Sequence, residues 1–342
     1  MELADFDYDL PEGSIAQAPI EPRDRARLLV DRGPGHPPEH RTVAHLPSLI
    51  RPGDVVVVNT TRVLPARLIL RKPTGGAVEV LLLERLATGA WEALVRPSRK
   101  VRPGTVLTAG PDLDVRFGGP GPGDGEGTRE VVLTVPRGVD ELAVLDRYGV
   151  VPLPPYITAP LADPERYQTV FAERPGSVAA PTAGLHITPA VLDGCRAAGA
   201  RVEPVELLVG MGTFRPMTAP KVEDHHMHAE RYRVPPGTLA ACEDVRAAGG
   251  RVVAVGTTSV RALETAALSG QLEGRTELFI HRPWRWQLVD VLMTNFHLPR
   301  SSLLVLVDAF VGAPWRELYG TALAEGYRFL SFGDAMLLEA RA

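Results

Sequence analysis

The pattern of predicted secondary structure changes near residue 150, and this change limits the folds that the chain can adopt. Before that point, short runs of strand-forming residues follow one another with Gly, Pro and polar residues between them. The runs lie at residues 55–58, 67–70, 78–84, 91–95 and 131–135. Their length and spacing predict a small antiparallel sheet or barrel. The glycine-rich stretch 118–127 is interpreted as a long hairpin loop, because strand-like runs flank it.

Beyond residue 150, strand-like and helical segments alternate. Helices are predicted near residues 189–199, 238–249, 260–268 and 315–325. Strands are predicted near residues 202–209, 251–255 and 303–307. Such alternation is typical of an α/β layer architecture. A chain of 342 residues is long enough for two domains, so a β domain embedded in or followed by an α/β domain is expected.

Composition excludes two broad classes of protein. A hydrophobic fraction of 45% and a charged fraction of 23% are ordinary for a globular chain, and they exclude an intrinsically disordered or membrane-embedded one. The acidic N-terminus lacks the basic and apolar regions of a secretory signal, and no apolar run approaches the roughly 20 residues that span a bilayer. We therefore expect a cytoplasmic protein. Cys195 and Cys242 lie in alanine-rich helical stretches and are expected to be buried thiols.

The net charge of −4 argues against a polycation that coats nucleic acid non-specifically, although it permits a local basic patch. The densest basic stretch of the β region is 96–102, which contains Arg96, Arg99 and Lys100. A solvated hairpin is the default interpretation of this stretch. If nucleic acid binds there, the cations would contact phosphates, which position the partner without reading its sequence.

The segment 251–264 joins a buried strand to a helix through Gly256. Three hydroxyl residues follow, Thr257, Thr258 and Ser259. They can cap the helix and, with its free N–H groups, present donors to an anion or a ribose. The alternative is a plain capped turn. The segment lacks the glycine patterns of dinucleotide folds and of P-loops.

Two further segments carry histidines that could act in catalysis. His186 follows a proline and a glycine in the segment 178–188, and such an imidazole can serve as acid or base at cellular pH. His297 follows Asn295 and Phe296, where an aromatic ring between polar side chains suits a flat ligand. A structural turn and a satisfied strand end are the alternatives for the two segments.

The run 223–230 raises the question of a metal site, because His226 and His228 alternate and Glu230 follows. A third well-spaced ligand or a cysteine pair is missing from the pattern, so the zinc signal is weak. We expect His228 and Glu230 to line a loop or a substrate cleft instead, and we expect no metal.

The combination and order of these motifs resemble one family, the S-adenosylmethionine:tRNA ribosyltransferase-isomerases of queuosine biosynthesis. The resemblance runs along the whole chain. It rests on residues 6–19, 53–68, 151–157, 167–188, 210–217, 223–230, 253–264, 294–304 and 327–336.

The resemblance implies a large, barrel-like α/β domain formed by residues 1–60 and 155–342, with a small antiparallel β-barrel of residues 61–154 inserted. It implies transfer and isomerisation of the ribosyl group of S-adenosylmethionine onto the 7-aminomethyl group of a 7-deazaguanine in a tRNA anticodon. The products would be epoxyqueuosine-tRNA, adenine and methionine. S-adenosylmethionine would be a co-substrate, with no permanently bound cofactor, and we expect a monomer.

This chemistry has definite requirements. The sulfonium acidifies the C5′ hydrogens of the ribosyl group, so a base must remove one proton and the resulting ylide must be kept from water. Adenine needs a donor near its ring nitrogens in order to leave. Opening and reclosure of the ribose require polar side chains that hold its hydroxyls in fixed directions. No metal is needed, because the leaving groups are already activated by charge or protonation.

On this resemblance, His186 and His297 are the candidate acid/base pair. Asn295 and the hydroxyls after Gly256 would orient the ribosyl group or the methionine end, and Phe214 or Phe296 would stack on a base. Glu264 could pair with Arg261 instead of with a ligand. The candidate binding residues for S-adenosylmethionine are Gly210, Gly212, Thr213, Phe214, Gly256, Thr257, Thr258, Ser259, Arg261, Glu264 and Phe296. The candidate tRNA contacts are Arg62, Arg96, Arg99 and Lys100.

The chain departs from the family pattern at several positions. Leu208 stands where a histidine is usual, and Trp284 where a glycine is usual; Ala26 and Ile187 replace a serine and an aromatic residue. The first two leave room for a paralogue that uses the same sulfonium chemistry on a small nucleoside or amine. An alternative of another class is a non-catalytic tRNA-binding protein that has kept the fold.

Overall fold

A computed structural model describes residues 1–122, 127–210 and 217–341, and the chain divides into two compact units. Unit 1 contains Met1–Arg62, Pro154–Arg174 and Ala180–Ala342. Unit 2 contains Val63–Leu153 and Pro175–Ala179, so its sequence is inserted into that of unit 1. In the described ranges, no helix has both the length and the apolar character needed to cross a membrane.

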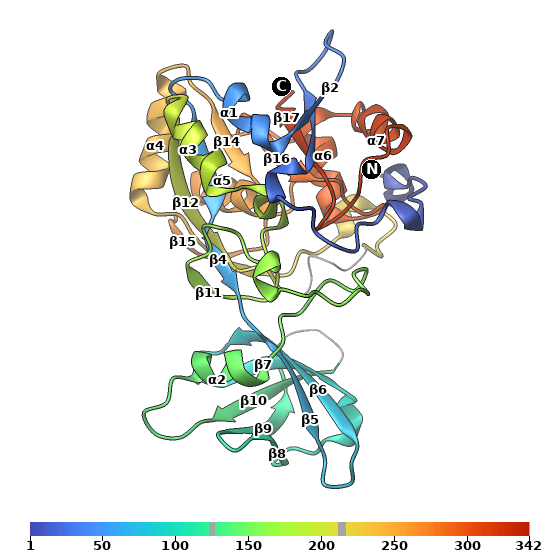
Figure 1. The fold of residues 1–342 in the computed structure, drawn as a ribbon, viewed down its shortest axis with the longest axis vertical. Coiled ribbons are helices and arrows are strands. Elements are labelled where there is room, and N and C mark those ends of the chain that lie inside the picture. The colour runs from blue at the N-terminus through green and yellow to red at the C-terminus, as the bar shows by residue number, and fades with distance from the viewer. Residues whose placement is uncertain (123–126, 211–216, 342) are drawn as a thin grey trace. The chain divides into compact units, whose positions relative to one another are not determined.

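Unit 1 is built on a nine-stranded mixed sheet (Figure 1). In spatial order its strands are β15 (Glu273–Thr276), β13 (Glu230–Arg233), β12 (Arg201–Leu207), β3 (Val55–Asn59), β14 (Val252–Val255), β16 (Val291–Asn295), β17 (Ala335–Glu339), β1 (Arg27–Asp31) and β2 (Glu39–Thr42). The four strands β12, β3, β14 and β16 run parallel to one another. β3 and β14 are buried at every position, which explains their continuous valine-rich sequences.

Helices cover both faces of this sheet. They are α1 (Leu46–Leu49), α3 (Pro189–Ala197), α4 (Pro236–Ala247), α5 (Thr257–Ser269), α6 (Ser302–Val311) and α7 (Trp315–Ala324). α1 and α3 pack on the face to which Val56 and Val58 point, in one core cluster with Val253 and Val255. α4, α5 and α6 lie against the sheet from the other side. The predicted buried thiols are confirmed, with Cys195 on α3 and Cys242 on α4.

Two details of the predicted α/β domain are wrong. The described strand pairings run from β15 at one edge to β2 at the other, so the large sheet is open there and not barrel-like. The run 303–307 is helix α6 and not a strand. Ser301 caps this helix by accepting a hydrogen bond from the Leu304 N–H, and nearly all of α6 is buried, so its apolar residues show no helical periodicity.

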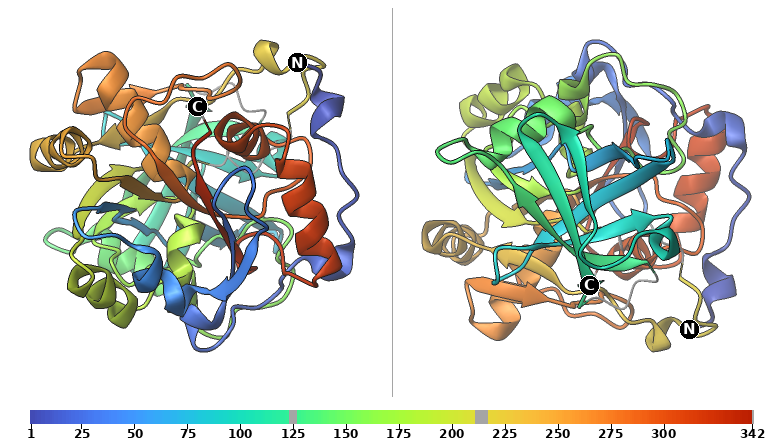
Figure 2. Two further views of the ribbon diagram at one scale, coloured as in Figure 1. Left: turned by 90° about the horizontal axis from the view of Figure 1, so that it is seen from above. Right: turned by 90° about the horizontal axis from the view of Figure 1, so that it is seen from below.

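Unit 2 contains a six-stranded antiparallel sheet (Figure 2). Its spatial order is β5 (Arg67–Arg71), β6 (Ala77–Arg85), β7 (Trp91–Arg96), β10 (Thr128–Thr134), β9 (Leu113–Pro120) and β8 (Val106–Gly110). The first and last strands also approach each other, so the sheet curls into a nearly closed barrel, as predicted. Helix α2 (Glu141–Tyr148) follows the strands, and the predicted hairpin across 118–127 is confirmed by the pairing of β9 with β10. A separate two-stranded sheet joins β4 (Thr61–Val63) and β11 (Arg174–Ser177).

Candidate active site

The candidate site of unit 1 lies where its parallel strands end. β3 ends at Asn59, β14 runs into Gly256 and β16 ends at Asn295, so polar and turn residues gather at the carboxyl edge of the sheet. In open α/β sheets this edge is where ligands bind. Asn59 ties two strand ends together, because its amide donates to the Leu207 carbonyl at 3.0 Å and accepts from the Leu207 N–H at 3.2 Å.

Asn295 links three segments of unit 1. Its Nδ2 lies 3.0 Å from His186 Nε2 and donates to the Asp334 carbonyl at 3.3 Å. Its Oδ1 accepts a hydrogen bond from the Thr182 hydroxyl at 2.9 Å. Thr182 and His186 both lie on the short helix η7 (Thr182–His186). Two predicted catalytic residues, far apart in the sequence, are therefore in direct contact.

The His186 imidazole is neutral at physiological pH. Burial, the largest cause, and the positive charges of Arg328, Arg166 and Arg23 together lower its pKa to about 3. Because Asn295 Nδ2 is a donor, Nε2 is the accepting nitrogen and the proton of the neutral ring is on Nδ1. Nε2, whose lone pair accepts the Asn295 N–H, is therefore the one atom of the ring that can take up a proton, and the low pKa means that this proton would be held weakly.

A small pocket adjoins His186. Its lining residues are Pro19, Ile20, Arg23, Arg166, Leu185, His186 and Phe332. Arg23 donates to the Gln168 carbonyl at 2.7 Å, and Arg166 donates to the Ile20 carbonyl at 2.8 Å. This pocket therefore has a basic wall beside an aromatic one.

The turn at Gly256 opens helix α5, as predicted. Gly256 has φ +88°, which a side chain would disfavour, and it is the N-cap residue of the helix. The prediction that the following hydroxyls cap the helix is wrong, because no side chain caps it. Ser259 donates to the Val255 carbonyl at 2.8 Å, and the buried Thr258 hydroxyl has no hydrogen-bond partner in the part of the chain that the structure describes.

His297 lies in a different environment from His186. Its Nε2 is 2.9 Å from the Thr294 hydroxyl, and burial lowers its pKa to about 3. Its backbone N–H donates to the Tyr319 hydroxyl at 3.0 Å. Phe296 is fully buried, with its ring centroid 4.8 Å from that of Phe329 and 5.4 Å from that of Tyr319. Phe296 is therefore part of the aromatic core, which argues against a stacking role at a substrate.

Glu264 holds a loop in place. This fully buried carboxylate accepts hydrogen bonds from the backbone N–H groups of Gln287, Leu288 and Val289 at 2.9, 2.9 and 3.1 Å. It also accepts from Trp284 Nε1 at 3.3 Å. The unusual Trp284 therefore donates to a carboxylate that the sequence motif predicts as a ligand contact. The carboxylate oxygens are occupied by this loop, so Glu264 is assigned a structural role.

Arg261 pairs with Glu230, which corrects the expected pairing with Glu264. Both members are buried, and Arg261 also donates to the Leu278 carbonyl at 3.1 Å. The other Glu230 oxygen accepts the Gly210 N–H at 2.9 Å. Glu230 thus fixes the chain at Gly210. Within the described ranges, no group of three or more His, Cys, Asp or Glu side chains is placed to hold a metal ion.

The remaining predicted residues are distributed over both units. Gly212, Thr213 and Phe214 lie outside the described residues. Arg62 is in unit 1 and lies 2.5 Å from Glu165, whereas Arg96, Arg99 and Lys100 are in unit 2, at the end of β7 and on the following turn.

The sequence interpretation missed two residues that position the Asn295–His186 pair. Thr182 binds Asn295 directly. Asp334 offers its carbonyl to Asn295, and its carboxylate accepts the backbone N–H groups of Arg27 at 2.9 Å and Arg328 at 2.8 Å. An acidic residue next to the apolar run 335–338 was the available signal for Asp334.

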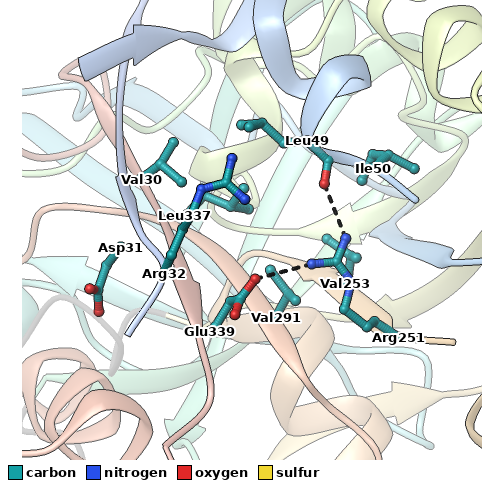
Figure 3. Close-up of a pocket in the computed structure, with 10 residues that line it drawn as sticks. All are labelled: Val30, Asp31, Arg32, Leu49, Ile50, Arg251, Val253, Val291, Leu337 and Glu339. Atoms are coloured by element: carbon teal, nitrogen blue, oxygen red, sulfur yellow. Dashed lines mark hydrogen bonds and ion pairs between the residues drawn. The ribbon is translucent and has the colours of Figure 1, made fainter. Parts of the chain in front are cut away.

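A second pocket of unit 1 lies at the opposite edge of the sheet, because Arg251 precedes β14 (Figure 3). Its apolar wall includes Val253, Val291 and Leu337. Arg251 is engaged there, donating to Glu339 at 3.2 Å and to the Leu49 carbonyl at 3.0 Å. The Arg251 guanidinium therefore links strand β17 to helix α1.

Comparisons with known proteins decide the family. The family model described as "Queuosine biosynthesis protein" matches residues 3–338. The chain belongs to this queuosine biosynthesis family. It is 50% identical to the S-adenosylmethionine:tRNA ribosyltransferase-isomerase of Symbiobacterium thermophilum, over 99% of this chain and 100% of that one. It is 49% identical to the protein of the same name from Moorella thermoacetica, again over 99% and 100% of the two chains.

A solved structure supports the same assignment. The crystal structure of the S-adenosylmethionine tRNA ribosyltransferase from Thermotoga maritima matches with a TM-score of 0.56 and 38% identity. The match covers 97% of this chain and 99% of that one. The resemblance found in the sequence motifs is confirmed, and this member of the queuosine biosynthesis family is an enzyme.

Proposed function

We propose that this chain transfers and isomerises the ribosyl group of S-adenosylmethionine onto the 7-aminomethyl group of a 7-deazaguanine in tRNA. The products are epoxyqueuosine-tRNA, adenine and methionine. The observation that carries this proposal is the buried, neutral His186 in contact with Asn295 at the carboxyl edge of the sheet. Relatives that match over their full lengths carry the corresponding enzyme name.

His186 is the proposed base and acid of the reaction. Its Nε2 exchanges the Asn295 N–H for a proton from the acidified C5′ position next to the sulfonium. The resulting imidazolium is a strong acid, because burial and three neighbouring arginines hold its pKa low. It is therefore suited to pass the proton to the departing adenine. His297 is the second candidate for proton transfer, and its low pKa results from burial.

Asn295 and Thr182 are the proposed positioning residues. Asn295 contacts His186 with one end of its amide and Thr182 with the other, so it fixes the imidazole and the start of η7 together. This arrangement is suited to holding ribosyl hydroxyls in fixed directions while the ring opens and recloses. No step requires a metal ion, because the sulfonium and the protonated adenine are already good leaving groups.

We assign the chemistry to unit 1 and a role in tRNA binding to basic residues of both units. Arg62, Arg96, Arg99 and Lys100 are the proposed phosphate contacts, which would make binding salt-dependent. We further propose a cytoplasmic monomer. The comparisons favour the tRNA substrate over a small amine and over a non-catalytic tRNA-binding protein.

One assay tests the proposal against both alternatives. The protein is incubated with S-adenosylmethionine and tRNA that bears the aminomethyl-deazaguanine base, and adenine is followed by chromatography. Adenine release that depends on this tRNA is expected. Release only with a small amine would identify the paralogue, and salt-sensitive tRNA binding without adenine release would identify the binding protein.

A further inference from the structure

The start of helix α5 presents several hydrogen-bond donors with no acceptor. The helix has 13 residues, and its first N–H groups, on Thr257, Thr258 and Ser259, have no partner among the described residues. The Thr258 side chain adds a fourth donor. This residue is 9% exposed, and its buried Oγ1 likewise has no partner among residues 1–122, 127–210 and 217–341. An unpaired buried hydroxyl costs about 1–3 kcal/mol, which a ligand that accepts its hydrogen bond would offset.

The Thr258 hydroxyl points back toward the beginning of the helix. Its Oγ1 lies 3.5 Å from the position that a Cβ on Gly256 would occupy, and the Ala183 methyl lies 3.8 Å from the same point. Ser259, one residue later, instead turns its hydroxyl to the Val255 carbonyl. The lack of a side chain on Gly256 therefore leaves space beside the Thr258 hydroxyl, the Thr258 backbone N–H and the Ala183 methyl.

These donors select an anionic group. The N-terminus of a helix carries a partial positive charge, and its N–H groups bind carboxylate or phosphate oxygens without a cationic side chain. S-adenosylmethionine has one anionic group, the α-carboxylate of its methionine moiety. We propose that the start of α5 binds this carboxylate, with the Thr258 hydroxyl as one of its donors. The proposal rests on the proposed function, because it concerns the substrate of that reaction.

The burial of the start of α5 favours a carboxylate over an RNA phosphate as the anion that binds there. Gly256 and the three residues that follow it are all buried, which suits the end of a small molecule better than the backbone of a polymer. A phosphate has a better partner in unit 1, because Arg23 and Arg166 line the pocket on His186.

The distance to the proposed chemistry fits the methionine chain. β14 pairs with β16, with Val255 opposite Met293, so the start of α5 and Asn295 lie at the ends of neighbouring strands. Neighbouring strands are about 4.8 Å apart, which the short chain between carboxylate and sulfonium can span. Thr182 and Ala183 connect the two places, since Thr182 binds Asn295 and Ala183 adjoins Gly256. A carboxylate held at α5 thus brings the sulfonium toward His186.

The experiment compares two ligands on two variants. Calorimetric titration measures the affinity of the full-length protein for S-adenosylmethionine and for decarboxylated S-adenosylmethionine, which lacks the carboxylate. Thr258→Val removes the hydroxyl and keeps the shape of the side chain. Thr238→Val is the matched control, because Thr238 also lies in the first turn of a helix, α4, and its hydroxyl donates to the Pro204 carbonyl at 2.8 Å.

Thr258→Val is expected to weaken the binding of S-adenosylmethionine about 10-fold, equivalent to about 1.4 kcal/mol. Its affinity for the decarboxylated ligand should stay the same, and Thr238→Val should leave both affinities unchanged. Equal weakening of both ligands by Thr258→Val, or no weakening, would overturn the proposal. A third outcome would also overturn it. If Arg166→Met loses the preference for S-adenosylmethionine over the decarboxylated ligand and Thr258→Val has no effect, the carboxylate binds at the pocket lined by Arg23 and Arg166.

The two levels of the proposal can fail separately. If the wild-type protein releases adenine but Thr258→Val has no ligand-specific effect, the carboxylate site is wrong and the proposed reaction stands. If the wild-type protein neither binds S-adenosylmethionine nor releases adenine in the presence of tRNA, the proposed function and the carboxylate site fall together.

Discussion

The two edges of the nine-stranded sheet of unit 1 use buried polar groups in opposite ways. At the amino edge, Asp54 accepts the Arg51 N–H at 2.9 Å and binds Arg251 through both carboxylate oxygens, at 2.6 and 3.3 Å. At the carboxyl edge, the buried Thr258 hydroxyl has no partner within the described ranges, and His186 is held neutral. A saturated buried network stabilises the fold, whereas groups left ready to bond are suited to a ligand.

This contrast separates residues for stability from residues for chemistry. Substitutions at the amino edge should change the free energy of unfolding and spare the reaction. Substitutions at the carboxyl edge should impair the reaction and leave the free energy of unfolding at neutral pH nearly unchanged. Four predictions test the separation.

The largest effect is expected for His186→Ala. Loss of the proposed acid and base should lower the rate of adenine release about 10²–10⁴-fold, with the fold intact by circular dichroism. His36→Ala is the control, since His36 is exposed in a turn. Turnover like that of the wild type in His186→Ala would remove His186 from the reaction.

Asp54→Ala should have the largest effect on stability. It leaves Arg251 without its buried partner, so we expect the free energy of unfolding in urea to fall by about 3–5 kcal/mol. Adenine release per folded molecule should stay the same. The control is Asp193→Ala, because the exposed ion pair of Asp193 with Arg196 should contribute at most about 0.5 kcal/mol. A small loss in Asp54→Ala together with impaired turnover would contradict the assignment of this edge to stability.

The low pKa of His186 predicts a pH dependence of stability. A histidine with a folded-state pKa of about 3 and an unfolded value near 6.5 stabilises the fold fully above pH 6.5. This contribution is lost as the pH falls from 6.5 toward 3, by at most about 1.4 kcal/mol per pH unit, because the unfolded chain binds the proton first. Urea unfolding at pH 7, 6 and 5 should show a shallower decline in His186→Ala than in the wild type. Parallel declines would mean that His186 titrates normally in the folded state.

The smallest effect distinguishes two buried threonines in the absence of ligand. Thr238→Val loses a made hydrogen bond and should lower the free energy of unfolding by about 1 kcal/mol. Thr258→Val loses no hydrogen bond and should leave stability unchanged or raise it. Thermal unfolding of the two variants beside the wild type measures both. Destabilisation of Thr258→Val equal to that of Thr238→Val would show that its hydroxyl has a partner in the folded protein.

Much of the site was accessible from the sequence as segments. The strand at 251–255, the glycine turn and the helix after it follow from local preferences, and all three occur in the structure. The prediction of a strand at residues 303–307 was wrong, because a helix buried on nearly all sides and a buried strand have the same apolar composition. Glu264 and Arg261 lie three residues apart on α5 and suggested a local pair, yet their partners come from other segments.

The sequence by itself determined the strand-rich region before residue 150 and the alternating strands and helices after it. It also determined the buried strands, the turn at Gly256 and the family. Each of these depends on residues that are close together or on motifs in a fixed order. Only the tertiary structure decided that His186 binds Asn295, that Glu264 is saturated by a loop and that the described residues leave the Thr258 hydroxyl unpaired. The physical reason is that hydrogen bonding and desolvation depend on what other segments bring to a side chain, and no local pattern carries that information.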